Sequence, residues 1–147
     1  MSVDASRFGD DLLQGYPVGT EVPADLANGE IGANTLAAIR SDTGEVQQFS
    51  ADGTAYSGLL VATREFEAAG TDAREREGDR AHRGLRKRQV IKLDTDNAIS
   101  NPGDWLGEEV HATDEHTVSL SSGTNTEPVG PVREVREEED MVYVLVE

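Results

Sequence analysis

The C-terminal twenty residues decide the fold class: positions 128–147 read PVGPVREVREEEDMVYVLVE. Val142, Val144 and Val146 lie on one face of an extended strand, because side chains alternate with a period of two. The acidic run from Glu137 to Asp140 separates this strand from an apolar run at 129–135. A helix would instead repeat its apolar residues every three to four positions. The stretch therefore predicts a terminal β-hairpin.

The same pattern of short apolar runs between turn signals extends upstream. Asp42-Thr43-Gly44 and Asp52-Gly53 are typical of tight turns, where glycine supplies a positive φ. The strands expected in these regions are 36–40, 46–49, 56–63, 89–93, 105–112 and 117–120. Short strands separated by turns favour an antiparallel meander. We therefore predict an all-β protein built from small antiparallel sandwich or barrel units.

Four segments are expected along the chain. Residues 1–29 are rich in glycine and proline and predict an extended N-terminal arm, with a disordered tail as the alternative. Residues 30–66 form a first β unit, 67–88 a charged loop, and 89–147 a second β unit.

The two β units look pseudo-repeated. Each has a glycine before its first strand, a hairpin, a polar loop and an apolar strand containing glycine. These glycines are Gly32 and Gly58 in the first unit, and Gly107 and Gly130 in the second. Glycine inside a strand often marks a bulge or a close backbone approach. Two unrelated meanders of similar pattern are the alternative.

Composition narrows the habitat and the partners. The 147 residues include 29 acids and 13 bases, a net charge of −16, and arginine outnumbers lysine eleven to two. Acidic, lysine-poor and cysteine-free composition resembles proteins of extreme halophiles; an ordinary acidic protein is the alternative. Wrapping of nucleic acid is excluded, because phosphate contacts need excess cations. We expect no membrane partner, since no apolar run reaches the ~18 residues of a spanning helix, and the N-terminus does not read as a signal peptide.

One segment reverses this charge. Residues 71–92 carry eight basic and four acidic side chains, a local charge of +4. Arginine forms bidentate pairs with carboxylates, so Arg83, Arg86, Lys87 and Arg88 are predicted to bind an acidic partner. A solvated loop and a nucleic-acid site are the alternatives. In the arm, Tyr16 and Val18 are the predicted partner-binding residues.

Catalytic chemistry finds no support in the sequence. Cysteine, a G-x-S-x-G motif and a phosphate-binding loop are all missing, and so few aromatic residues are poorly suited to a glycosidase cleft. His111 and His116 flank a predicted polar turn, and a zinc site would need further converging ligands. Asp94-Thr95-Asp96-Asn97 begins like a calcium loop but lacks its later ligands. We therefore expect no enzyme, metal or cofactor.

The second β unit resembles capsid decoration and cement proteins of tailed viruses, which are small, β-rich and begin with an extended arm. The resemblance covers residues 30–66 and 89–147. In the second unit it rests on the following positions: Ala98-Ile99, Pro102-Gly103-Asp104, Val110, Thr117-Val118, Val129-Gly130, Val142 and Val144. In the first unit it rests on Asn34-Thr35-Leu36 and Ser57-Gly58-Leu59-Leu60.

This resemblance implies a structural virion protein on the outside of an icosahedral capsid. Its implied partners are the major capsid protein and copies of itself, as a trimer. With the composition, it implies a virus of haloarchaea. Another virion role, as a turret, tail or head–tail joining protein, and a small ligand-binding β-barrel remain the alternatives.

Overall fold

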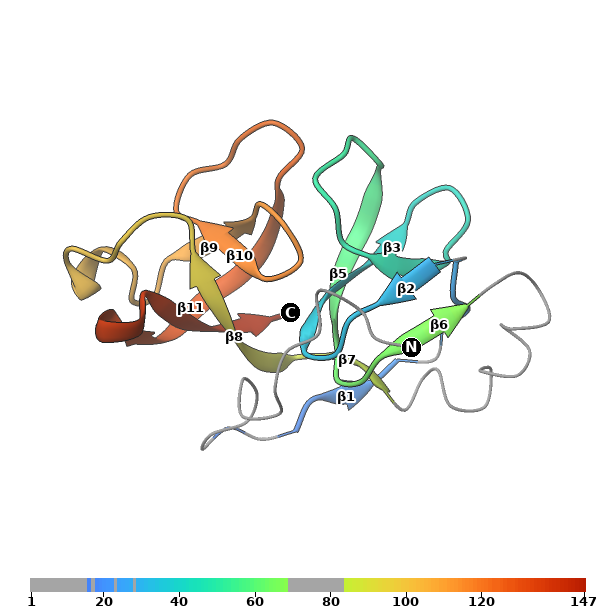
Figure 1. The fold of residues 1–147 in the computed structure, drawn as a ribbon, viewed down its shortest axis with the longest axis horizontal. Helices are drawn as coiled ribbons and strands as arrows, with labels where there is room; N and C mark the ends of the chain where they lie inside the picture. The colour runs from blue at the N-terminus through green and yellow to red at the C-terminus, as the bar shows by residue number, and fades with distance from the viewer. Residues whose placement is uncertain (1–15, 17, 23, 28, 69–83) are drawn as a thin grey trace.

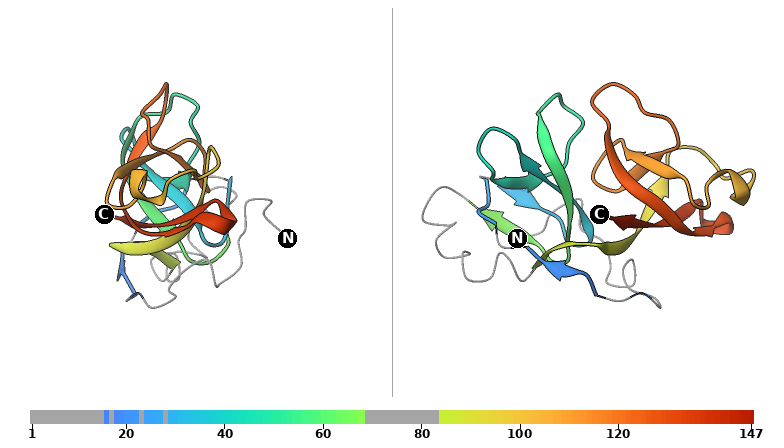
Figure 2. Two further views of the ribbon diagram at one scale, coloured as in Figure 1. Left: turned by 90° about the vertical axis from the view of Figure 1, so that its left-hand side faces the viewer. Right: turned by 180° about the vertical axis from the view of Figure 1, so that it is seen from behind.

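A computed structural model describes residues 16, 18–22, 24–27, 29–68 and 84–147. The described part is all-β, as the sequence predicts, with strands arranged in a five-stranded sheet, a closed barrel and a two-stranded sheet (Figure 1). The barrel and the five-stranded sheet lie beside each other along the long axis, and the C-terminus lies between them (Figure 2). No helix in the described residues is long and apolar enough to cross a membrane.

The five-stranded sheet is antiparallel throughout, with the order β1-β7-β5-β3-β4. Its strands are β1 (Thr20–Glu21), β7 (Leu85–Lys87), β5 (Tyr56–Ala62), β3 (Thr35–Arg40) and β4 (Val46–Gln48). The two-stranded sheet pairs β2 (Gly29–Ile31) with β6 (Phe66–Ala68). The turn between β3 and β4 contains Gly44 at φ 74°, the left-handed conformation that the sequence predicts there.

The barrel closes through the order β10-β8-β12-β11-β9. Its strands are β8 (Gln89–Thr95), β9 (Glu109–Ala112), β10 (Thr117–Ser119), β11 (Glu127–Arg136) and β12 (Met141–Val146). The β8–β10 pair is parallel and the other pairs are antiparallel. Strands β11 and β12 form the predicted terminal hairpin, joined by a 3₁₀ turn, η3 (Glu137–Glu139).

The two predicted units share a local topology. In the first, β3 lies between β4 and β5; in the second, β9 lies between β10 and β11. Both glycine-containing strands shift register beside the glycine: β5 at Gly58, which is opposite Ile39, and β11 at Gly130, which is opposite Val110. The shifts are the bulges that strand glycines indicate. The pseudo-repeat therefore holds at the level of strand pairing.

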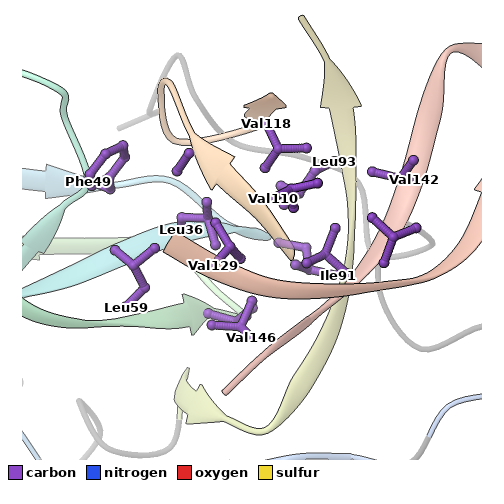
Figure 3. Packing of buried hydrophobic residues seen from close by; sticks show 14 of the residues in the cluster. Leu36, Phe49, Leu59, Ile91, Leu93, Val110, Val118, Val129, Val142 and Val146 are labelled. Carbon is purple, nitrogen blue, oxygen red and sulfur yellow. The ribbon is translucent and has the colours of Figure 1, made fainter. Parts of the chain in front are cut away.

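One hydrophobic core joins the five-stranded sheet to the barrel. Leu36 and Leu59 from the sheet pack in the same buried cluster as Ile91, Val129 and Val146 from the barrel (Figure 3). A backbone hydrogen bond of 2.8 Å from Leu36 N to Glu115 O also joins β3 to the β9–β10 turn. The two β units are therefore not independently packed, because the sheet covers one side of the barrel core.

A second core lies on the opposite face of the sheet. Side chains in β3 and β5 alternate between the two cores: Leu36 and Leu59 face the barrel, whereas Ala37 and Leu60 belong to the second cluster. This second cluster also contains Ile31 of β2 and buried residues of the arm and of strands β4, β5, β6 and β7: Leu26, Val46, Ala62, Phe66 and Leu85. Burial on both faces explains the continuous apolar run in β5, which does not alternate with polar residues.

Three boundaries differ from the sequence prediction. The expected charged loop 67–88 ends in a strand, since Leu85–Lys87 form β7; most of the rest of that segment, 69–83, lies outside the described residues. The expected arm contributes β1 and a buried residue, Leu26. The strand expected over 105–112 begins only at Glu109, because the preceding 3₁₀ turn η2 (Pro102–Asp104) and Gly107, at φ 83°, delay the extended conformation.

Candidate functional site

The chain passes from the five-stranded sheet to the barrel at a sharp corner. Strand β7 ends at Lys87, β8 begins at Gln89, and Arg88 between them has φ 57°. A left-handed conformation costs a non-glycine residue roughly 1–2 kcal/mol, so surrounding contacts must hold it in place. Lys87 and Arg88 are both exposed here, and neither forms an ion pair within the described residues. We call these two residues the basic corner.

The side chain of Arg86 contacts two residues of the N-terminal arm, Gly19 and Glu21. Its Nη1 donates to the carbonyl oxygen of Gly19 at 2.6 Å, and its Nη2 contacts Glu21 Oε1 at 3.1 Å. The Arg86 side chain is only 19% exposed. A charge-assisted hydrogen bond of this kind contributes roughly 1.5–3 kcal/mol. In the described structure Arg86 thus fastens β1 to β7.

The buried side chain of Gln89 also binds Gly19, through the backbone N–H of that residue. Its Oε1 accepts a 2.8 Å hydrogen bond from Gly19 N, and its Nε2 donates to Val90 O at 3.1 Å. A Cβ at Gly19 would lie 2.5 Å from the Lys87 carbonyl oxygen, so only glycine permits this approach. Arg86 and Gln89 therefore bind the two backbone polar groups of Gly19, its carbonyl oxygen and its N–H.

Tyr16 extends this contact onto the barrel. Its ring lies 5.6 Å from the Tyr143 ring between centroids, and its hydroxyl donates to Glu134 Oε1 at 3.0 Å. Burial, followed by the hydrogen bond to Glu134 and the charge of that carboxylate, raises the pKa of the Tyr16 hydroxyl above its usual range. Val18 is 60% exposed.

The predicted partner-binding set thus divides into three groups. Lys87, Arg88 and Val18 lie at the surface, where a partner can reach them. Arg86 and Tyr16 contact the same chain. Arg83 lies outside the described residues.

Charge is distributed unevenly between the corner and the barrel. Residues 93–147 contain fourteen acidic and two basic side chains. The densest acidic stretch, Glu137 to Asp140, forms the β11–β12 turn, at the end of the barrel away from the five-stranded sheet (Figure 1). Lys92 partly neutralises it through an ion pair with Glu139, which lowers the pKa of that carboxyl. The surface therefore offers a small basic corner beside a strongly acidic barrel.

The two histidines considered in the sequence do not come together in one cluster. His111 lies in β9, whereas His116 lies in the β9–β10 turn, with its Nδ1 2.9 Å from Asp94 Oδ2. Asp114, Glu115 and His116 bring ligand atoms within 4.8 Å of one another, and all three are half-buried. His116 and Asp94 also join the turn to β8. Asp94 is therefore occupied by this contact, and Thr95 Oγ1 donates to Asn97 O at 2.7 Å.

A surface pocket of about 360 Å³ opens at the barrel end beside the β8–β9 connection. Its wall comes from that connection and from the end of β10, including Asp96, Asn97, Trp105, Leu120 and Ser121. Trp105 is 5% exposed and Leu120 is 37% exposed.

Sequence reasoning missed Gln89 and this pocket. A glutamine that begins an apolar strand gives no sign of burial, because its partner, Gly19, is seventy positions away. The pocket did have a signal: the single tryptophan follows the turn Asn101-Pro102-Gly103-Asp104.

Comparison with known proteins finds no matching family model, no curated relative and no similar solved structure.

Proposed function

We propose that this chain is a structural virion protein that binds the outside of an icosahedral capsid and stabilises it. Its partners in this proposal are the major capsid protein and copies of itself, as a trimer on the capsid surface. The proposal begins from the sequence resemblance to decoration and cement proteins, and it agrees with the all-β architecture.

The observation that carries the proposal is that apolar side chains fill the barrel. Ile91, Leu93, Val110, Val118 and Val142 are each fully buried in its core. A barrel that holds a small ligand inside needs a cavity of roughly 300–1,000 Å³. Because the interior is filled, any partner must bind to the outer surface of the barrel. This counts against the alternative of a barrel that carries its ligand inside.

The basic corner supports a contact with an acidic neighbour. Lys87 and Arg88 are exposed and project from a backbone position fixed by the β7–β8 junction. Their own chain supplies no described carboxylate to pair with them. Against nucleic acid, residues 93–147 carry fourteen acidic side chains and only two basic ones, whereas a phosphate-binding surface needs excess cations.

Stabilisation follows from mass action. A protein that binds the assembled shell but not its free subunits lowers the free energy of the shell in proportion to RT ln(1 + [L]/Kd). At a free concentration of about 100 times Kd this amounts to about 2.7 kcal/mol per site. No catalytic group is needed for such a role.

Reconstitution tests the proposal directly. The major capsid protein encoded in the same genome is assembled into shells, and the purified chain is added in high salt and sedimented through a sucrose cushion. We expect saturable co-sedimentation and a higher melting temperature of the shells. An unrelated acidic protein of similar mass is the control. If the chain stays in the supernatant at all concentrations, the proposal is wrong.

A further inference from the structure

The β9–β10 turn brings a histidine and two carboxylates together beside a third carboxylate, from β8. Asp114, Glu115 and His116 belong to the turn, and their ligand atoms lie within 4.8 Å of one another. Asp94, in β8, contacts the His116 ring. His111, the other histidine considered in the sequence, is not a member of this group. The cluster plays no part in the capsid proposal, which uses the basic corner.

The backbone of the turn is held by both neighbouring strands. Leu36 N in β3 donates to the Glu115 carbonyl oxygen at 2.8 Å, and Asp94 N in β8 donates to the His116 carbonyl oxygen, also at 2.8 Å. Within the turn, His116 N donates to Asp114 Oδ1 at 2.9 Å. The side chains of the cluster therefore start from a fixed backbone, which lowers the entropic cost of binding a ligand.

Contacts of the imidazole ring determine which of its nitrogens carries the proton. His116 Nδ1 lies 2.9 Å from Asp94 Oδ2, and an ionised carboxylate only accepts hydrogen bonds, so Nδ1 must donate. Thr117 Oγ1, at 3.2 Å, is a second neighbour of the same nitrogen. In the neutral ring the lone pair then belongs to Nε2. Histidines that bind metals are typically oriented by a carboxylate in this way.

A second carboxylate lies near that lone pair. His116 Nε2 is 3.6 Å from Glu115 Oε1, longer than the usual N–H···O range of about 2.7–3.2 Å. A nitrogen and an oxygen that bind the same zinc ion, at about 2.1 and 2.2 Å, lie at most about 4.3 Å apart. The separation therefore suits a shared ion better than a shared proton.

The charge of the cluster also favours a cation. Among the described residues, Asp114 and Glu115 form ion pairs with His116 alone. Asp94 contacts the same ring, so three carboxylates surround one imidazole, and even a protonated ring leaves an excess of two negative charges in the group. These side chains are 24–45% exposed, so water and salt screen their repulsion less than at a fully exposed surface.

The types of ligand atom select the class of ion. Imidazole nitrogen suits zinc, nickel and copper, whereas calcium and magnesium take oxygen ligands. Asp114 has two carboxylate oxygens, so one can bind an ion while Oδ1 accepts the His116 N–H. From the ring orientation, the 3.6 Å spacing and the excess charge, we infer that His116 Nε2, Glu115 and Asp114 bind one divalent transition-metal ion of the zinc class. Water completes the coordination, as in other zinc sites with three protein ligands.

Titration of the intact chain with zinc tests this site. The protein is stripped of metal with EDTA, desalted, and titrated with ZnCl₂ by isothermal titration calorimetry in a non-chelating buffer at neutral pH, at a salt concentration at which it is folded. We expect saturable binding of one ion with a Kd of about 100 μM or lower. Because zinc binds the folded turn, a free concentration of about 100 times Kd should raise the melting temperature by about 5 °C or more.

Two variants and two matched controls sharpen the test. Glu115→Gln keeps the shape of the side chain and the backbone bond to β3 but removes the charge, and it should weaken zinc binding by about tenfold or more. His116→Gln removes the ring and should abolish the site. Glu109→Gln and His111→Gln make the same exchanges in β9, outside the cluster, and should bind zinc like the parent protein. Far-UV circular dichroism of every variant checks the fold.

Three results would overturn the inference. One is the absence of saturable zinc binding, in which case a protonated His116 alone holds the carboxylates. Another is zinc binding that Glu115→Gln and His116→Gln leave unchanged, as expected of scattered sites on an acidic surface. The third is displacement of zinc by an equal concentration of CaCl₂, because the ligands would then be oxygen atoms alone. The sedimentation assay measures capsid attachment separately, so neither result decides the other.

Discussion

Replacing Gly130 with alanine should be among the most destabilising small changes in this protein. Gly130 has φ 152°, and a Cβ there would lie 1.9 Å from the carbonyl oxygen of Leu145. Real Cβ contacts essentially never fall below 3.0 Å, so the backbones of β11 and β12 would have to separate by about 1.1 Å. The Cβ is attached directly to the backbone of β11, and the Leu145 oxygen belongs to the backbone of β12 in the closed barrel, so no flexible side chain can absorb the shift.

The expected cost follows from strain at a restricted backbone position. Holding a non-glycine residue in such a conformation costs roughly 1–3 kcal/mol, and the displaced strand adds to it. We therefore expect Gly130→Ala to lower the free energy of unfolding by about 3 kcal/mol or more. For a chain of this length, about 3 kcal/mol corresponds to a melting temperature lower by roughly 6–12 °C.

Gly58→Ala is the matched control. Gly58 occupies the corresponding bulged position of β5, but nothing lies within 4 Å of the Cβ that alanine would add. Its effect should stay within about 1 kcal/mol. Urea unfolding of both variants at one fixed salt concentration, followed by circular dichroism, gives the comparison. Equal midpoints for Gly130→Ala and Gly58→Ala would refute the steric argument.

Four further predictions follow from charge and from the arm. Arg86→Ala should lower stability by about 1.5–3 kcal/mol, because it removes charge-assisted bonds to the arm; unchanged urea midpoints would contradict this. Lys87→Glu with Arg88→Glu should leave the melting temperature within a few degrees yet reduce shell occupancy in the sedimentation assay; full occupancy would show that the basic corner is only solvated. The net charge of −16 predicts that added salt raises the melting temperature, and a melt that is cooperative and salt-independent in dilute buffer would argue against the halophilic interpretation. The raised pKa of the Tyr16 hydroxyl in the folded state means that its contribution to the free energy of unfolding is complete below pH 10.0 and is lost as the pH rises through the folded-state pKa. Tyr16→Phe should therefore reduce the loss of stability at alkaline pH. Identical melting temperatures of the two proteins across the alkaline range would contradict this prediction.

Local patterns in the sequence were sufficient for the terminal hairpin and for the strand glycines, but not for β1 and β7, which lie in the segments expected as an arm and a loop. The alternation of Val142, Val144 and Val146 and the acidic turn before them predicted the β11–β12 hairpin, and the structure confirms it. Gly58 and Gly130 were expected at bulges, and both adjoin a register shift. Such features depend on neighbours a few positions away, so a single sequence contains them.

Features that depend on distant pairing could not be predicted in the same way. Closure of the barrel depends on the parallel β8–β10 pair, and nothing local marks Asp94 as the partner of Thr117. Nothing local to the basic run marks Gly19 and Glu21, more than sixty positions away, as the residues that Arg86 contacts. The pocket likewise needs the β8–β9 connection and the end of β10 to meet.

The core shared between the five-stranded sheet and the barrel has a consequence for inheritance. Leu36 and Leu59 complete a cluster whose other members, such as Val129 and Val146, belong to the second half of the chain. Neither half carries a full set of packing partners, so exchange of one half between related genes would bring together surfaces that never adapted to each other. Recombination breakpoints near residue 88 should therefore be selected against, and the two halves should be passed on as a single piece.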